Sequence, residues 1–293
     1  MWGVLQKLVI DMELQHDLLP REPVTSGIFY EHTKVVNLLI VMPIYNEANI
    51  LSEKLTYLYK YLMTTTYSFQ LVLSVDDSGD DSVRIATEFK AQNDHVEVIV
   101  HHEKKGRGFA VREAWKKFDA EYFSFIDADL AMGVDIISDS LSFLNNSKYD
   151  MVTASRYCSG SKVERPPLRN AVSKIYNRML RIMFDEKLND HQCGFKIINV
   201  QVKKYVLNKT DINSWFWDTE LLVKAIKSGF KIAELPVTWK EIKYNKTSIK
   251  RLGKDIGIHG YGILRLLRDV RIKKFASHEM TMENENSHMN HLI

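Results

Sequence analysis

The sequence has 293 residues, which is enough to bury a sizeable core in one large domain or two small ones. Its hydrophobic content of 45% and charged content of 26% are those of a soluble globular protein, and its 2 cysteines exclude a disulfide framework. The cysteine count favours a reducing, cytoplasmic setting, and there is no run of about 18 apolar residues that could span a membrane.

From residue 35 onward, short apolar runs alternate with stretches of helical periodicity. Five apolar runs predict strands, at Val35–Met42, Phe69–Val75, Val96–His101, Tyr122–Ile126 and Met151–Ser155. Helical patterns between them begin at Asn46 and cover about Ser82–Gln92 and Phe109–Phe118. Strands separated by helices of this length form a mostly parallel sheet with right-handed crossovers. The sequence therefore predicts an α/β fold typical of nucleotide-binding proteins, although a fold alone does not identify a reaction.

Two acidic residues follow the fourth predicted strand directly. Asp127 and Asp129, separated by Ala128, lie at the carboxyl end of a strand, where open α/β sheets bind their ligands. Two carboxylates at this spacing can hold one divalent cation and the phosphates that it carries, and hard oxygen ligands favour Mg²⁺ or Mn²⁺ over zinc. For an isolated pair, the alternative is a solvated turn with two acids.

The ends of the first two predicted strands carry further polar candidates. Pro43 fixes the exit from the first strand and Tyr45 can flank a planar base, whereas Asn46 could equally be a helix N-cap. At the second strand end, one carboxylate of Asp76 and Asp77 could accept hydrogen bonds from a base or a ribose, while the other caps the turn.

The turn after the third strand, Lys104–Gly108, is basic and contains two glycines. Its spacing matches neither a Walker A loop nor the GxGxxG motif. Basic groups beside glycines suit a diphosphate through charge and close backbone approach, and the alternative is a solvated basic turn.

Four short motifs occur in order at these strand ends. They are PxYNE at 43–47, VDDS at 75–78, KGRGxAVR at 105–112 and DAD at 127–129. Together they resemble the inverting nucleotide-sugar glycosyltransferases of family 2, over about Val35–Glu241. The resemblance implies the GT-A fold, with a mostly parallel central sheet flanked by helices, and a nucleotide-diphosphate sugar as donor. The donor-binding residues that it implies are Pro43, Tyr45, Asn46, Glu47, Asp76, Asp77, Lys105, Gly106, Arg112, Asp127, Ala128 and Asp129.

Motifs in the second half of the chain narrow the resemblance to one group of glycosyltransferases. These motifs are SRY at 155–157, PLRN at 167–170, DHQCGFK at 190–196, WDTELL at 217–222 and IAELPVTW at 232–239. They are similar to those of dolichyl- and polyprenyl-phosphate hexosyltransferases, and closer to the glucosyl than to the mannosyl branch. The chain departs from the family in lacking hydrophobic anchor helices and in its turn Asp77-Ser78-Gly79, where Asp-Asp-Gly-Ser is usual.

The resemblance also implies residue roles on the acceptor side. Arg156, Arg169 and Ser173 would bind the acceptor phosphate, and a surface salt bridge is the alternative for either arginine. Gln192, Asp218 and Glu220 would line the sugar pocket, with helix-cap or structural roles as alternatives. The implied catalytic residues are Asp127, Asp129, Arg156, Arg169, Gln192, Asp218 and Glu220.

The implied reaction needs orientation and charge neutralisation more than acid–base chemistry. A lipid phosphate is anionic at neutral pH and can attack the anomeric carbon without a dedicated general base, while arginines orient it through fork-like contacts. A Mg²⁺ or Mn²⁺ ion at Asp127 and Asp129 would neutralise the leaving diphosphate. We expect UDP-glucose as donor. The alternatives are a GDP-mannose-dependent mannosyltransferase, a family 2 enzyme acting on another glycan or lipid, and a non-catalytic nucleotide-binding protein.

Positive charge is concentrated near the end of the chain. Lys240–Phe275 contains eleven Lys/Arg and three Asp/Glu, so its charge is +8 and that of the remaining chain is −5. Apolar residues recur there at helical spacing, at Ile249, Leu252, Ile256, Ile263, Leu267 and Val270. We expect this stretch to lie on an anionic membrane surface, at the cytoplasmic face, and the alternative is a surface helix packed on the domain. We expect no nucleic acid as partner, because the charge is confined to one amphipathic stretch that lacks interleaved aromatic residues at the usual density.

The expected organisation follows from these segments. An N-terminal extension covers 1–34, a catalytic domain 35–248, a basic amphipathic segment 249–275 and a flexible tail 276–293. Within the catalytic domain, the donor half extends to about residue 130 and the acceptor half covers about 131–248.

Overall fold

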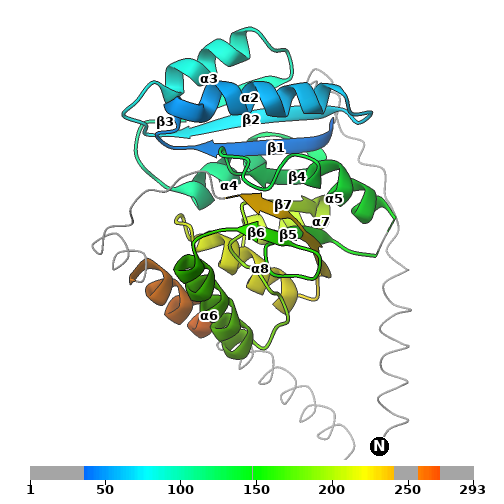
Figure 1. The fold of residues 1–293 in the computed structure, drawn as a ribbon, viewed down its shortest axis with the longest axis vertical. Helices are drawn as coiled ribbons and strands as arrows, with labels where there is room; N and C mark the ends of the chain where they lie inside the picture. Colours follow the sequence, from blue (N-terminus) through cyan, green and yellow to red (C-terminus); the bar gives the residue numbers. More distant parts are fainter. Residues whose placement is uncertain (1–35, 147, 241–256, 271–293) are drawn as a thin grey trace, which may run out of the picture. The chain divides into compact units, whose positions relative to one another are not determined.

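A seven-stranded sheet with the strand order β3-β2-β1-β4-β7-β5-β8 lies at the centre of this computed structural model (Figure 1). The structure describes residues 36–146, 148–240 and 257–270. The strands of the sheet are β1 (Val36–Ile44), β2 (Phe69–Asp76), β3 (Val96–His101), β4 (Ala120–Ile126), β5 (Met151–Ser155), β7 (Phe195–Asn199) and β8 (Ile232–Pro236). β1 pairs in parallel with β2 and β4, whereas β7 lies antiparallel between β4 and β5. The sheet is therefore mostly parallel, as predicted.

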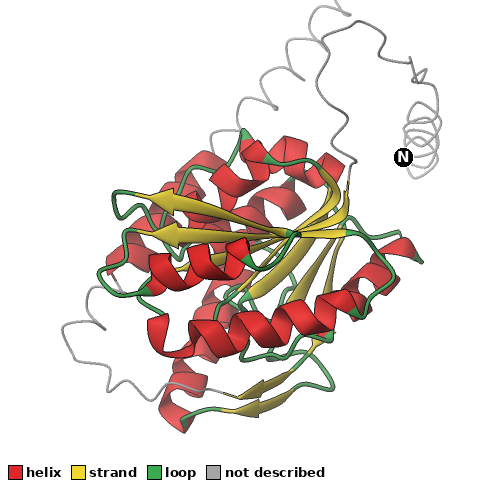
Figure 2. Ribbon diagram, turned by 90° about the horizontal axis from the view of Figure 1, so that it is seen from above, coloured by secondary structure: helices red, strands yellow, loops and turns green. Residues whose placement is uncertain are grey.

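Helices cover both faces of this sheet, as Figure 2 shows. They are α2 (Ala48–Met63), α3 (Ser82–Ala91), α4 (Arg107–Lys117), α5 (Ile136–Asn145), α6 (Pro167–Phe184), α7 (Val200–Leu207), α8 (Trp217–Lys227) and a further helix at 257–270. A separate two-stranded sheet pairs β6 (Lys162–Glu164) in parallel with β9 (Thr238–Lys240). This is the α/β architecture that the sequence predicted.

The central strand β1 shows why the sheet needs helices on both faces. Alternate side chains of a strand point to opposite faces, and those of β1 are apolar on both. Leu38 and Ile40 lie in one core with the leucines of α2, whereas Leu39 and Val41 lie in another with Trp115 of α4. Removal of this apolar surface from water is the main favourable term in folding.

Several element boundaries differ from the prediction by one or two residues, and those of β1 and α4 have a clear physical cause. β1 continues through Pro43, which lies opposite Ser74, to Ile44. The pairing of β1 with β4 has already ended at Val41, so a residue without an N–H costs fewer hydrogen bonds here than in mid-strand. α4 begins earlier than predicted, because Gly106 adopts a φ of 99° and lets the chain turn directly into the helix.

The helix at 257–270 packs on the domain through its apolar residues. Ile263 and Leu266 are buried in a small core with Phe216, against which Leu267 and Val270 also pack. Tyr261 and Leu264 of the same helix are exposed, so this described part of the predicted basic segment packs only some of its apolar residues on the domain.

Other predicted segments lie outside the described residues, namely the extension 1–34, the tail 276–293 and the remaining parts 249–256 and 271–275 of the basic segment. None of the helices that the structure describes is both long enough and apolar enough to cross a bilayer.

Candidate active site

The predicted polar residues gather because β1, β2 and β4 run in one direction and end at one edge of the sheet. β7 runs the opposite way, so Gly194, just before it, lies beside Asp127, just after β4. The Asp127 N–H donates to the Gly194 carbonyl oxygen at 2.9 Å. A Cβ at Gly194 would collide with the Asp127 carboxylate, so the absence of a side chain there makes room for the acid.

Asp127 is held by Arg107, the first residue of α4. Nη1 of Arg107 donates to both carboxylate oxygens of Asp127, at 2.8 and 3.1 Å. The same guanidinium forms an ion pair with Asp218 of α8, and its carbon lies 4.1 Å from the centroid of the Trp215 ring. Arg107 belongs to the basic KGRGxAVR motif but was not among the predicted site residues. The motif could have identified Arg107 as a site residue, because it places Arg107 in the first turn of a helix that starts beside the strand ends.

Lys196 completes a group of two basic and two acidic side chains. It is fully buried in β7, and its Nζ donates to the Cys193 carbonyl oxygen at 3.0 Å and lies 3.7 Å from Asp218 Oδ1. Burial, together with the positive charge of Arg107, lowers the pKa of Lys196 to about 7. We term Arg107, Asp127, Lys196 and Asp218 the charge cluster. Because buried charge is costly unless it is paired, each member depends on the others.

The other two residues predicted for the sugar pocket have protein partners on α8 and the loop before it. Glu220 accepts hydrogen bonds from the Ile212 N–H at 3.0 Å and from Lys224 Nζ at 2.6 Å. These contacts match the structural role that was the alternative for Glu220. Gln192 Nε2 donates to Thr219 Oγ1 at 2.9 Å, which ties the segment before β7 to α8.

Asp76 shapes the basic turn. Its two carboxylate oxygens accept hydrogen bonds from the N–H groups of Lys105 and Gly106, both at 2.8 Å. A Cβ at Gly106 would lie 2.6 Å from the Asn213 carbonyl oxygen, so the turn packs closely on the loop before α8. Arg112 holds the same loop by donating to one of its carbonyl oxygens at 2.7 Å. Asp76 and Arg112, two of the residues predicted to bind the sugar-nucleotide donor, thus hold backbone segments in position.

The PxYNE segment joins the first two strand ends. Asn46 adopts a φ of 53°, and its side chain accepts a hydrogen bond from the Gly79 N–H at 2.8 Å. The alternative that Asn46 is the N-cap of α2 is therefore wrong, because Glu47 occupies that position. The Glu47 N–H donates to Ser82 Oγ at 2.9 Å, which connects α2 to the start of α3.

Tyr45 and Asp77 are exposed at this edge of the sheet. Lys104 Nζ lies 3.5 Å from the centroid of the Tyr45 ring, so the aromatic face already attracts a cation. Both side chains are accessible to a ligand that lies across the strand ends.

Arg156 follows β5 and forms a buried ion pair in place of the surface salt bridge that was the alternative. Its Nε and Nη2 donate to the two carboxylate oxygens of Asp190, at 2.7 and 2.8 Å. Its guanidinium carbon lies 5.0 Å from the centroid of the Trp239 ring. Burial disfavours the charge, but the Asp190 carboxylate more than offsets this and raises the pKa of Arg156 above its ordinary value.

Arg169 and Ser173 lie in the first two turns of α6. Ser173 Oγ accepts a hydrogen bond from Nη1 of Arg165 at 2.9 Å. Arg165, just before the helix, was not among the predicted residues, and its guanidinium contacts one of those predicted for the acceptor phosphate.

Asp127 and Asp129 offer the kind of ligand that Mg²⁺ or Mn²⁺ requires. Their carboxylates flank Ala128, 21% of the Asp127 side chain is exposed, and Asp129 Oδ1 accepts the Ala131 N–H at 3.2 Å. These hard oxygen donors fit either cation. Within the described residues, no group of three or more acidic, histidine or cysteine side chains is arranged to hold an ion, so phosphate oxygens and water would have to complete the coordination.

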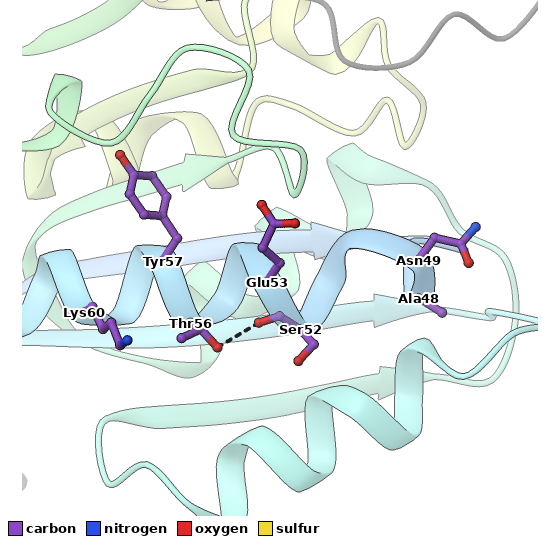
Figure 3. Close-up of a pocket in the computed structure, with 7 residues that line it drawn as sticks. All are labelled: Ala48, Asn49, Ser52, Glu53, Thr56, Tyr57 and Lys60. Carbon is purple, nitrogen blue, oxygen red and sulfur yellow. Dashed lines mark hydrogen bonds between the residues drawn. The ribbon is translucent and has the colours of Figure 1, made fainter.

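A surface hollow along α2 lies apart from these residues (Figure 3). It is lined by Ala48, Asn49, Ser52, Glu53, Thr56, Tyr57 and Lys60. All come from one helix, and the hydrogen bond drawn, from Thr56 Oγ1 to the Ser52 carbonyl oxygen at 2.8 Å, is local to that helix. None of the predicted site residues lines this hollow, so it is not the candidate donor site.

Comparisons with known proteins agree with the motifs. The family model described as glycosyl transferase family 2 matches residues 39–206, more than half of the chain. Glycosyltransferase AglD of Haloferax volcanii is 28% identical over 249 residues, a match that covers 84% of this chain but only 39% of AglD. The dolichyl-phosphate beta-glucosyltransferase of Mus musculus is 27% identical over 269 residues, covering 86% of this chain and 81% of the mouse protein.

Solved structures show the same fold. Glucosyl-3-phosphoglycerate synthase from Mycobacterium tuberculosis, in complex with UDP, superimposes with a TM-score of 0.62 at 14% identity, covering 79% of this chain and 80% of that one. A second structure of that synthase, with Mn²⁺, UDP and phosphoglyceric acid, has a TM-score of 0.59 at 12% identity, over 79% of this chain and 78% of the other. The predicted GT-A fold is confirmed. By the extent of its match to the family model, the chain belongs to glycosyl transferase family 2 and is a glycosyltransferase.

Proposed function

We propose that this glycosyltransferase transfers glucose from UDP-glucose to a polyprenyl or dolichyl phosphate, with inversion at the anomeric carbon. The observation that carries the proposal is the similarity, along most of the chain, to a protein named as a dolichyl-phosphate beta-glucosyltransferase. The motifs of the acceptor half support the same assignment, since they resemble the glucosyl branch of the lipid-phosphate hexosyltransferases.

The donor would lie across the ends of β1, β2 and β4. Tyr45 and Asp77, both exposed, would contact the base and the ribose, and the basic turn offers positive charge to the diphosphate. Asp127 and Asp129 would hold a Mg²⁺ or Mn²⁺ ion, which when bound neutralises charge on the leaving diphosphate. Arg107 fixes the orientation of the Asp127 carboxylate through its two hydrogen bonds.

The acceptor supplies its own nucleophile. A phosphate oxygen forms the new bond to the anomeric carbon, the bond from that carbon to the diphosphate breaks, and the electron pair leaves with the nucleoside diphosphate. An ionised phosphate has no proton to lose, so the acceleration comes from proximity and preorganised charge. Arg169 and Ser173 would orient the acceptor at the start of α6, and Arg156 would contribute Nη1, since Asp190 holds its other two nitrogens.

The location of the acceptor implies a location for the enzyme. A polyprenyl tail keeps the acceptor phosphate at a bilayer surface, so the protein would act as a peripheral protein at the cytoplasmic face of a membrane. An anionic membrane surface is the proposed partner, because the chain carries basic segments that such a surface attracts.

One assay tests the proposed function. The protein is incubated with labelled UDP-glucose, GDP-mannose or UDP-GlcNAc, each with a polyprenyl phosphate, and the lipid phase is extracted. We expect label in the lipid only from UDP-glucose, and a β-glucosyl product from the α-linked donor. Lipid label from GDP-mannose would establish the mannosyltransferase alternative. Donor binding without any lipid label would point to another acceptor or to a non-catalytic protein.

A further inference from the structure

α6 has two apolar faces, and only one of them is buried. Leu180 and Phe184 pack into the small core with Phe216, and Tyr176 packs beside them. Besides Met183, which is 37% exposed, the other face exposes five large apolar side chains that recur every three or four residues. They are Leu168, which is 76% exposed, Val172 at 50%, Ile175 at 69%, Met179 at 39% and Ile182 at 73%. We term these five residues the exposed stripe.

The spacing places the exposed stripe along a single line of the helix. At about 3.6 residues per turn, positions three and four apart lie one above the other, so the five side chains form one continuous strip. Scattered exposed apolar residues are normal on a soluble protein, but a continuous apolar strip marks a surface that contacts something else.

The charges of α6 indicate what that partner is. The helix contains four basic residues and no acidic one, namely Arg169, Lys174, Arg178 and Arg181. By the same helical geometry, Lys174 and Arg178 lie along the edge of the exposed stripe, and both are exposed. An apolar strip edged by lysine and arginine is the pattern of a helix that lies in the headgroup region of an anionic bilayer.

Charge also argues against a second copy of this chain as the partner. Two copies of α6 placed with their stripes face to face would bring Lys174 and Arg178 of both copies together, with no acidic side chain from either helix. Like charges in close juxtaposition oppose such an interface. An anionic lipid surface, in contrast, satisfies both the apolar strip and the basic edge.

We propose that α6 docks the enzyme on an anionic membrane, with the exposed stripe toward the acyl chains and Lys174 and Arg178 toward the lipid phosphates. Arg169 and Ser173 start the same helix, so docking would bring the residues proposed for the acceptor phosphate to the bilayer surface. The inference deepens the proposed function and rests on it only for the identity of the lipid acceptor. It assigns docking to α6, whereas the described part of the C-terminal segment uses Ile263 and Leu266 for domain packing.

Vesicle flotation with the full chain tests the docking surface. The vesicles consist either of phosphatidylcholine with phosphatidylglycerol or of phosphatidylcholine alone. We expect the parent protein to float with the anionic vesicles, and less so when salt is added. Ile175→Glu combined with Ile182→Glu should lower binding at least about tenfold, because it places charge in the apolar strip. Lys174→Glu combined with Arg178→Glu should lower it in the same direction.

The matched control alters exposed apolar residues of another helix. Tyr57→Glu combined with Met63→Glu on α2, where the side chains are 53% and 55% exposed, should leave vesicle binding unchanged. Circular dichroism and thermal unfolding confirm that each variant is folded. The inference is overturned if the parent does not bind anionic vesicles, if the α6 variants bind as the parent does, or if the control variant loses binding equally.

Transfer assays separate this inference from the proposed function. The α6 variants should lose transfer to a vesicle-embedded polyprenyl phosphate but keep transfer to a short-chain, water-soluble one. If the parent binds vesicles through α6 yet transfers sugar to neither acceptor, the proposed function fails and the docking surface stands. If the parent and the α6 variants are equally active on vesicles, the docking surface is refuted and the proposed function stands.

Discussion

Replacing Arg107 by alanine should destabilise the protein strongly, because Arg107 neutralises two carboxylates at once. Only 4% of its side chain is exposed, and its partner Asp218 is completely buried. Removing one partner of a buried ion pair leaves an uncompensated charge and costs about 3–5 kcal/mol. For a domain of this size, that free energy lowers the Tm by roughly 6–20 °C. Thermal unfolding followed by circular dichroism, together with urea unfolding, measures both quantities.

Arg84 provides the matched control for Arg107. It also pairs with two acids, Asp81 at 2.8 Å and Glu88 at 3.0 Å, but 57% of its side chain is exposed. Arg84→Ala should therefore leave the Tm close to that of the parent, because exposed ion pairs contribute little. Adding Asp218→Asn to Arg107→Ala should recover part of the lost stability, since it removes the unpaired charge. Equal losses for the two arginines, or no recovery in the double variant, would refute the reasoning.

Three further predictions concern the metal, the acceptor and the buried lysine. Asp129→Asn should lower transfer by at least about two orders of magnitude, and EDTA should silence the parent until Mg²⁺ or Mn²⁺ is added; full activity in EDTA would contradict the metal role. Arg169→Ala should raise the KM for lipid phosphate far more than the KM for the sugar nucleotide, with only partial rescue by lysine; equal changes would indicate a general effect. The pKa of Lys196 is lowered to about 7 in the folded state, so between pH 7 and the ordinary lysine pKa of about 10.5 the unfolded state binds more protons than the folded state. The free energy of unfolding should therefore rise with pH across this range, by up to about 1.4 kcal/mol per pH unit. Urea unfolding across this range should show the rise in the parent and lose it in Lys196→Met, and a parent without the rise would contradict the shifted pKa.

The strands and the edge that carries the site could be predicted from local sequence. β3 and β5 have the predicted bounds, and β2 extends one residue further, to Asp76. Apolar runs that end at turn residues contain enough information to define such strands. Parallel strands end at a common edge, so the positions of the motifs along the chain already implied a shared site.

The charge cluster could not be predicted in the same way. Lysine and arginine are ordinarily exposed, and only partners that are distant in the sequence make their burial favourable. Arg107 meets Asp127 20 residues later and Asp218 on a different helix, and both contacts exist only once the sheet has formed. β7 was missed for a related reason, since Lys196 interrupts its apolar run and its antiparallel pairing is set by neighbours on both sides.

The antiparallel strand β7 has a mechanical consequence for how this enzyme handles two substrates. On one side it is hydrogen-bonded to β4, which leads to Asp127, and on the other side to β5, which leads to Arg156. Moving the donor half away from the acceptor half would break the ladder between β4 and β7, so the two halves are not built to open and close as independent lobes. The proposed donor and acceptor would therefore meet in a frame that is assembled before either binds, and the flexibility that turnover requires would reside in the surrounding loops and side chains.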